Sequence, residues 1–222
     1  MTIRHHPPRH HPSGAWLTGY AAGTLDLGEH VAVATHLAAC ARCREAARLM
    51  EHVGGAMLAS LSPTPMADGA LARIEARFHT PAAEKPLPAP SGPAPLASVP
   101  GLPAFVRQYA AAPWKWIAPG VRSRPIVLPF ASETRVFLLR SAPGTRMLEH
   151  THDGTEMTCV LTGGFSHGQH HYGPGDFDLG EEGMDHRIAV APGEDCLCLI
   201  AMRGKLRLKG VLGRLLEPLI RL

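Results

Sequence analysis

The chain has 222 residues, enough for one or two domains, and 45% of them are hydrophobic, so it can bury a core and is not a disordered segment. Its 22 Lys and Arg against 19 Asp and Glu give a net charge of +3, which is too small to imply nucleic-acid binding by charge alone. No apolar run reaches the roughly 18 residues of a membrane helix, and no apolar stretch follows the basic start, so we expect neither membrane insertion nor a secretory signal and place the chain in the cytoplasm.

The first 80 residues predict a small helical bundle. Ser13 is a candidate N-cap for a first helix that ends at Gly23, and apolar residues at three-to-four spacing predict further helices over about 26–39, 42–61 and 68–78. Four short helices bury only a thin core, and domains of this size often need a metal or a disulfide to hold them together.

A His and Cys cluster lies where the second predicted helix meets the third. His36 and Cys40 are one helical turn apart on the same face, and Cys43 follows in C-x-x-C spacing. Two thiolates and an imidazole suit a tetrahedral zinc site, and this setting favours metal binding over structural disulfides. A redox C-x-x-C and unligated core thiols are the alternatives. The residues alone leave the fourth ligand open among the other histidines of this half: His5, His6, His10, His11 and His30.

Proline marks a division of the chain. Residues 81–103 contain eight of the 21 prolines, and because proline fixes the backbone and removes a donor, this stretch predicts a semi-rigid, extended linker. We therefore predict a helical zinc-binding domain over 1–80, a linker over 81–103 and a second domain over 104–222.

The second domain predicts a β-barrel. Short apolar runs, for example over 135–139, 157–161 and 196–201, alternate with Gly and Pro turns, which is typical of a sandwich or small barrel. In the last of these runs Cys196 and Cys198 face the same side of a strand. We interpret these two thiols either as buried apolar side chains or as an oxidant-reactive pair near the metal, and Cys159 is the remaining cysteine of this domain.

A second metal-ligand pattern lies in this domain. Two imidazoles at i, i+2 share one face of a strand, a carboxylate follows after a short bend, and a third imidazole comes after a Gly-rich segment. Three imidazoles and a carboxylate suit several divalent metals; we expect zinc first, with manganese, iron or nickel as alternatives. The four predicted ligands are His150, His152, Glu156 and His186.

Both patterns resemble known motifs. The zinc-containing anti-sigma motif is similar to the pattern His11-x24-His36-x3-Cys40-x2-Cys43, and the sequence around this pattern resembles the N-terminus of ChrR-type anti-sigma factors. The resemblance selects His11, with its neighbour His10 as the nearest rival, as the fourth zinc ligand. The barrel ligands resemble the two cupin motifs, with one departure, since Glu181 stands where that family usually has proline.

The resemblance covers nearly the whole chain and implies a regulator rather than an enzyme. It implies that the helical domain binds and sequesters a sigma factor of the extracytoplasmic-function group, and that the jelly-roll-like cupin domain senses an oxidative-type signal and releases it, without direct contact to nucleic acid or membrane. Candidate sigma contacts, which could instead fill the domain's own core, are Leu71, Ile74, Phe78, Trp16 and Tyr20.

An enzyme is the competing hypothesis. A cupin with three His and one Glu can be a metal-dependent dioxygenase or isomerase, in which Glu156 leaves the metal to act as a base and the helical half is an accessory zinc module. The N-terminal zinc motif argues against this alternative, because such an enzyme has no need of it. A DNA-binding regulator is disfavoured by the near-neutral charge and by the lack of a basic recognition helix.

Overall fold

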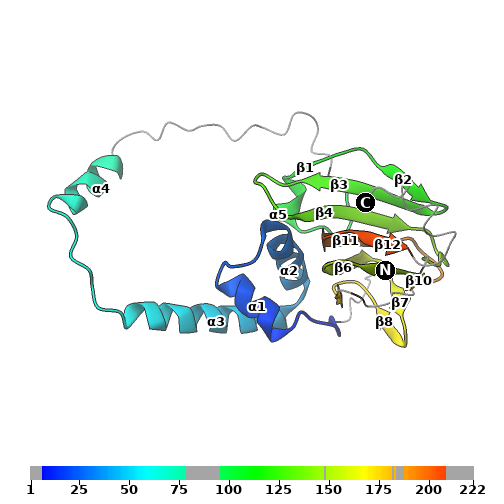
Figure 1. The fold of residues 1–222 in the computed structure, drawn as a ribbon, viewed down its shortest axis with the longest axis horizontal. Coiled ribbons are helices and arrows are strands. Elements are labelled where there is room, and N and C mark those ends of the chain that lie inside the picture. Colours follow the sequence, from blue (N-terminus) through cyan, green and yellow to red (C-terminus); the bar gives the residue numbers. More distant parts are fainter. Residues whose placement is uncertain (1–6, 79–95, 148, 182, 184–187, 209–222) are drawn as a thin grey trace.

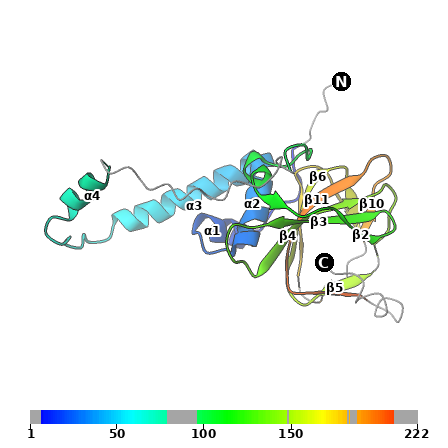
Figure 2. The same cartoon turned by 90° about the horizontal axis from the view of Figure 1, so that it is seen from above.

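A computed structural model describes residues 7–78, 96–147, 149–181, 183 and 188–208, in which a helical region lies against a β-barrel (Figure 1, Figure 2). Its helices are α1 (Gly14–Ala21), α2 (Leu27–Ala39), α3 (Ala41–Ala59), α4 (Ala70–Phe78) and α5 (Ala104–Arg107). Its strands are β1 (Ala110–Ala111), β2 (Lys115–Ala118), β3 (Val121–Val127), β4 (Thr134–Ser141), β5 (His150–His152), β6 (Glu156–Thr162), β7 (Phe165–His167), β8 (His170–Tyr172), β9 (Phe177–Gly180), β10 (Ile188–Val190), β11 (Cys196–Arg203) and β12 (Leu206–Leu208).

The strands form one large antiparallel sheet and two small ones. The large sheet has the order β1-β3-β4-β11-β6-β9, with β2 also paired to β3. The smaller sheets are β10-β7-β8 and β12-β5, and they close the barrel on its other side (Figure 2). The predicted fold class, a helical zinc-type domain followed by a cupin barrel, is confirmed.

Strand β11 shows why its sequence is an unbroken apolar run. Alternate side chains point to opposite faces of a strand, so one set faces the barrel interior and the other faces the helices. The interior set is Cys196, Cys198, Ile200 and Met202, and the outer set is Leu197, Leu199 and Ala201. The sheet is thus buried on both faces at β11, which removes the usual alternation of apolar and polar residues there.

Helix α2 supplies the layer that covers the outer face. Val31 and Ala32 of α2 belong to the same buried cluster as the outer residues of β11, and the Cys159 thiol of β6 donates to the carbonyl oxygen of Ala32 at 3.2 Å. The helical region and the barrel therefore share one hydrophobic core, and Figure 1 shows α2 directly beside the sheet.

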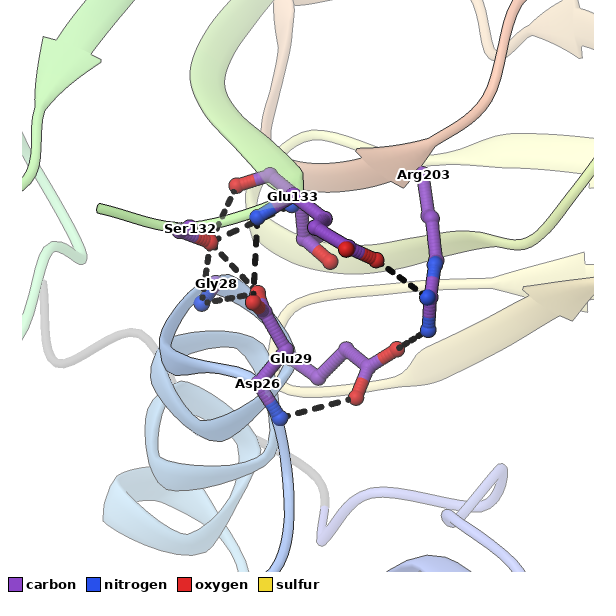
Figure 3. A network of polar contacts seen from close by, with 7 residues as sticks. Asp26, Gly28, Glu29, Ser132, Glu133 and Arg203 are labelled. Atoms are coloured by element: carbon purple, nitrogen blue, oxygen red, sulfur yellow. Dashed lines mark hydrogen bonds and ion pairs between the residues drawn. The ribbon is translucent and has the colours of Figure 1, made fainter.

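The start of α2 is tied to the loop between β3 and β4 (Figure 3). The Asp26 carboxylate accepts from the N–H of Gly28 at 3.0 Å, and the Glu29 carboxylate accepts from the N–H of Asp26 at 3.1 Å, which forms a capping box. Asp26 also accepts from the Ser132 hydroxyl and, at 3.1 Å, from the N–H of Glu133. One carboxylate therefore caps the helix and joins it to the barrel.

The same corner contains an arginine and a close backbone approach. Arg203, at the end of β11, pairs with Glu133 and lies 3.9 Å from Glu29. At Gly28 an added Cβ would lie 2.5 Å from the carbonyl oxygen of Thr134, so only glycine allows α2 to approach β4 this closely.

The end of the predicted linker differs from the prediction. Leu96, Val99 and Leu102 are buried in the core shared by α2 and the large sheet. Proline has no backbone N–H that would need a hydrogen-bond acceptor, so this stretch can lie on the sheet as a series of turns. Its Leu and Val side chains reach the core. Residues 79–95 and 209–222, at the predicted domain boundaries, lie outside the described residues.

The four predicted helices are present, but they do not pack as one bundle. The helical core consists of α1, α2 and the first half of α3 and is built from Leu17, Val33, Leu37, Cys40, Cys43 and Ala47. The second half of α3 leads away from the barrel and α4 lies beyond it, with no side chain of α4 buried (Figure 1).

Candidate functional site

The helix boundary between α2 and α3 brings three donor atoms together. His36 lies in the last turn of α2, Cys40 caps α3, and Cys43 lies in its first turn, all three buried. The Cys40 sulfur accepts from the N–H of Cys43 at 3.5 Å, which turns both thiols to the same side. The C-x-x-C spacing therefore brings the two cysteines together at the start of α3.

The fourth donor comes from the chain before α1. The Nδ1 atom of His11 lies 3.4 Å from Nε2 of His36, 3.5 Å from Sγ of Cys40 and 3.3 Å from Sγ of Cys43. All four donor atoms lie within 4.8 Å of one another. The structure thus brings together the four residues that the sequence predicted for the N-terminal site.

The distances fit zinc. With Zn–S near 2.3 Å and Zn–N near 2.0–2.1 Å, tetrahedral geometry separates an N and an S donor by about 3.5 Å and two N donors by about 3.3–3.4 Å. The three distances from His11 match these values without rearrangement. Two thiols and two imidazoles, three of them buried and His11 half-buried, are also the donor chemistry of structural zinc sites.

The protonation of His36 suits a ligand. Its Nδ1 atom lies 2.8 Å from the carbonyl oxygen of Gly175, which assigns the ring proton to Nδ1 and leaves the Nε2 lone pair directed at the cluster. Burial lowers the pKa of His36 to about 4, so the ring is neutral at physiological pH. Burial raises the pKa of the Cys43 thiol to about 12, so a thiolate forms there only with a cation beside it, and metal binding releases the proton.

The rival histidines of the helical half point elsewhere. His10 lies against the ring of Tyr172, with centroids 4.2 Å apart, and its Nε2 atom is 3.2 Å from the carbonyl oxygen of His171. His30 stacks on Tyr20 at 4.3 Å. His5 and His6 lie outside the described residues.

The predicted barrel site is described in part. His150 of β5 and Glu156 of β6 are both buried and line the same cavity. Burial raises the pKa of Glu156 to about 7, and the Thr158 hydroxyl donates to its carboxylate at 3.3 Å. His186 and the side chain of His152 lie outside what the structure describes, so the four-residue set stays a prediction.

The cavity itself is a small apolar space of about 110 Å³ inside the barrel. Apart from His150, Glu156, Thr158 and a serine, its walls are aliphatic, aromatic and sulfur-containing side chains. Cys196 and Cys198 of β11 line it with their sulfur atoms 3.6 Å apart. Cys159 is on the opposite face of the sheet, against α2, so it does not join that pair.

A large apolar surface lies on the second half of α3, on α4 and between them. Side chains at i, i+4 and i+8 form one stripe on α3, and side chains at i, i+3 and i+7 form another on α4. This projecting face is defined by nine side chains between 45% and 79% exposed: Leu49, Val53, Met57, Leu58, Leu61, Met66, Leu71, Ile74 and Phe78. The possibility that Leu71, Ile74 and Phe78 fill the domain's own core is therefore wrong, whereas Trp16 packs against the core.

Comparison with known proteins places both halves. A family model described as a putative zinc-finger matches residues 15–44, and one described as the ChrR cupin-like domain matches residues 103–205. The anti-sigma-E factor ChrR of Cereibacter sphaeroides is 35% identical over 226 residues, covering 100% of both chains. This chain belongs to the ChrR family of anti-sigma factors.

A solved structure agrees with the family membership. The crystal structure of Rhodobacter sphaeroides SigE in complex with the anti-sigma ChrR matches with a TM-score of 0.70 and 34% identity, covering 88% of this chain and 99% of that one. The family's named member is a regulator and not an enzyme, so the prediction against an enzyme is confirmed and the dioxygenase or isomerase alternative is not supported. Within the described residues, the helices are too short or too polar to cross a bilayer.

Sequence reasoning missed two parts of the site. It did not foresee that Gly175 of the barrel orients His36, although the sequence Gly173-Pro174-Gly175 is typical of a turn. It also did not foresee that the apolar stripe of α3 is exposed like that of α4, although the spacing of Leu49, Val53 and Met57 was visible in the sequence.

Proposed function

We propose that this chain is an anti-sigma factor that binds a sigma factor of the extracytoplasmic-function group and keeps it from core RNA polymerase. The observation that carries the proposal is the projecting face, because soluble proteins seldom expose so many large apolar side chains on two consecutive helices without a partner. The related ChrR chain was solved bound to SigE. Transcription is therefore regulated through protein binding, without a need for direct DNA contact.

The shape of the projecting face indicates how the partner is held. Two amphipathic helices joined by residues 60–69 present separate apolar stripes, each of which suits a groove on a helical protein. Burying one large apolar side chain contributes about 1.5–3 kcal/mol, and a nanomolar complex needs about −12 kcal/mol. Several of the nine side chains acting together can reach that affinity after the costs of association.

The N-terminal cluster is proposed as a structural zinc centre with His11, His36, Cys40 and Cys43 as its ligands. Zinc, when bound there, supplies a cross-link between the chain before α1 and the α2–α3 boundary. That cross-link holds the first half of α3 in place. The direction in which the second half of α3 projects follows from this, so the zinc centre controls the placement of the projecting face.

The barrel is proposed to hold a second divalent metal through His150, His152, Glu156 and His186. Zinc is the first expectation, with manganese, iron or nickel as alternatives. Two of these residues support the proposal, since His150 and Glu156 are buried beside one cavity, where a carboxylate is costly without a cation.

We also propose that the barrel senses an oxidative-type signal in the cytoplasm and releases the sigma factor. The sulfur atoms of Cys196, Cys198 and Met202 lie on the cavity wall next to the candidate metal ligands, where an oxidant entering the barrel would meet them. The shared core between α2 and the sheet gives the barrel direct contact with the helical domain. The signal therefore has a route that does not depend on the Pro-rich segment.

The test is co-purification and transcription with the full chain. Co-expressed with each extracytoplasmic-function sigma factor of its own organism, the zinc-loaded chain should co-purify with one of them in a 1:1 complex. It should also block transcription when added before core RNA polymerase. A zinc-loaded chain that binds none of these sigma factors and leaves their transcription unchanged would overturn the proposal.

A further inference from the structure

The chain segment that carries His11 is hydrogen-bonded to the barrel. Asp176, a buried residue in the turn between β8 and β9, accepts hydrogen bonds through Oδ1 from the N–H groups of Arg9 (2.6 Å) and His10 (3.0 Å). The N–H of Phe177 donates to the carbonyl oxygen of His10 at 3.1 Å. Three hydrogen bonds to one turn of the barrel therefore fix the backbone next to His11.

The same turn holds a second member of the cluster. The carbonyl oxygen of Gly175 orients the His36 ring at 2.8 Å. Gly175 has a φ of +90°, and an added Cβ would lie 2.9 Å from Pro8 Cγ and 3.1 Å from Ala39 Cβ. The turn thus touches both the segment before α1 and the end of α2, and glycine is needed for the backbone conformation and for the close approach.

The turn is a rigid part of the barrel. Oδ2 of Asp176 accepts from the N–H of Gly173 at 2.8 Å, and the Asp176 carbonyl accepts from the N–H of Val160 in β6 at 3.1 Å. Strand β9 continues from the turn along β6, where Gly180 is the register partner of Glu156. One strand therefore connects the contacts to the N-terminal cluster with the buried carboxylate of the barrel cavity.

We propose that Asp176 is a positioning residue for the N-terminal zinc centre, and that the barrel thereby sets how firmly the helical domain keeps its zinc. The inference rests on the zinc ligands proposed above and deepens the proposed function, because it names the turn over 173–177 as the contact through which the barrel acts on the helical domain. His11 lies outside the helices, in the segment before α1, so its position at the cluster depends on these anchors. Loss of groups that orient metal ligands typically lowers metal affinity 10- to 100-fold.

The test compares variants of the zinc-loaded full chain. Each is treated with excess EDTA and iodoacetamide, and alkylation of Cys40 and Cys43 is followed by peptide mass spectrometry, which reports on this cluster separately from any metal in the barrel. Asp176→Ala removes the carboxylate that accepts from the N–H groups of Arg9, His10 and Gly173. In this variant both cysteines should react at least tenfold faster than in the wild type. Amide hydrogen exchange at Arg9 and His10 should accelerate as well.

The matched control is Asp195→Ala. Asp195 is also an aspartate of the barrel, but its carboxylate accepts from the Arg140 side chain at 2.6 Å instead of from the segment before α1, so alkylation of Cys40 and Cys43 should stay within twofold of the wild type. Asp176→Asn, nearly identical in shape, should raise the alkylation rate of the two cysteines by a smaller factor. If circular dichroism shows that Asp176→Ala does not fold, the rate in Asp176→Asn tests the inference instead.

Three outcomes separate the hypotheses. Faster alkylation in the Asp176 variants, with a folded barrel and an unchanged control, supports the inference. Wild-type rates in a folded Asp176 variant overturn it and leave the zinc assignment intact. Wild-type cysteines that react equally fast with and without zinc overturn the zinc assignment and the inference with it.

Discussion

The helical domain contains two parts that differ in what holds them. The first part, α1, α2 and α3 as far as Ala47, is fixed by its own core, by the candidate zinc centre and by the barrel. The second part, α3 from Glu51 onward and α4, carries most of the projecting face and has no buried side chain (Figure 1). Both parts have helical sequence patterns, so the pattern does not explain the difference.

The comparison shows that an amphipathic pattern predicts burial without naming the partner. A nine-residue helix such as α4 is marginal alone in water, because a short helix gains too little to offset the cost of nucleation. In the first part the apolar faces find partners within the chain. In the second part the partner is, by the function proposed here, another protein.

The largest expected effect comes from removing zinc from the first part. Cys43→Ser, or chelation of the wild-type chain, should abolish sigma-factor binding and reduce the helical signal in circular dichroism, because a structural zinc contributes on the order of 10 kcal/mol to folding. Cys196→Ala, a cysteine change inside the barrel, should keep the N-terminal zinc. A Cys43→Ser chain that retains full sigma binding would contradict the structural role of the metal.

The next largest effect is expected from charged residues placed on the apolar stripe of α4, in the second part. Ile74→Glu combined with Phe78→Glu should weaken sigma binding at least about 100-fold, roughly 3 kcal/mol, because two exposed apolar anchors become charged. The melting temperature of the free chain should barely change, since neither side chain is buried. Titration calorimetry with the sigma factor measures the loss, and Ala72→Glu on another side of α4 is the matched control. Equal losses in both would show that α4 does not bind through its apolar stripe.

A smaller effect concerns the contact between α2 and the barrel. Gly28→Ala should destabilise the chain by about 1–3 kcal/mol, because its Cβ would lie 2.5 Å from the Thr134 carbonyl oxygen and the backbone must move. Gly54→Ala, in α3 with open space around it, should instead stabilise by about 0.5–1 kcal/mol. Urea unfolding of the two variants gives both values. Similar stabilities would mean that α2 does not sit this close to β4 in solution.

The smallest effect is expected at an exposed ion pair of α3. Glu45 and Arg48 are 4.0 Å apart, and both side chains are largely exposed. Glu45→Gln should change the free energy of unfolding by less than about 0.5 kcal/mol, because solvent screens such pairs. A loss above 1 kcal/mol in the same urea measurement would show that this turn of α3 makes further contacts.

Much of the site was predictable because its spacings are local. His36, Cys40 and Cys43 lie within eight residues, where helix geometry determines which side chains meet. The barrel strands were also visible, since apolar runs such as 196–201 between Gly and Pro turns leave few other structures. The helix boundaries agree within one or two residues for the same reason.

The choice between His10 and His11 was not available from spacing. Neighbouring residues of an extended segment point to opposite sides, and only docking on Asp176 determines which of them faces the cluster. The resemblance to a family selected His11, and the structure supplies the physical reason. The burial of Leu96 and Leu102 escaped prediction similarly, because it depends on a sheet surface that distant strands create.

By itself, the sequence determined the helical and barrel halves, the two patterns of candidate metal ligands and the apolar stripes, because each depends on residues close together in the chain. Only the tertiary structure decided that α2 packs on the sheet of the barrel, that Asp176 and Gly175 contact a cluster formed by residues 11–43, and that no side chain of α4 is buried. Those outcomes depend on which surfaces meet, and contacts between residues far apart in the chain are set by the packing of the whole molecule.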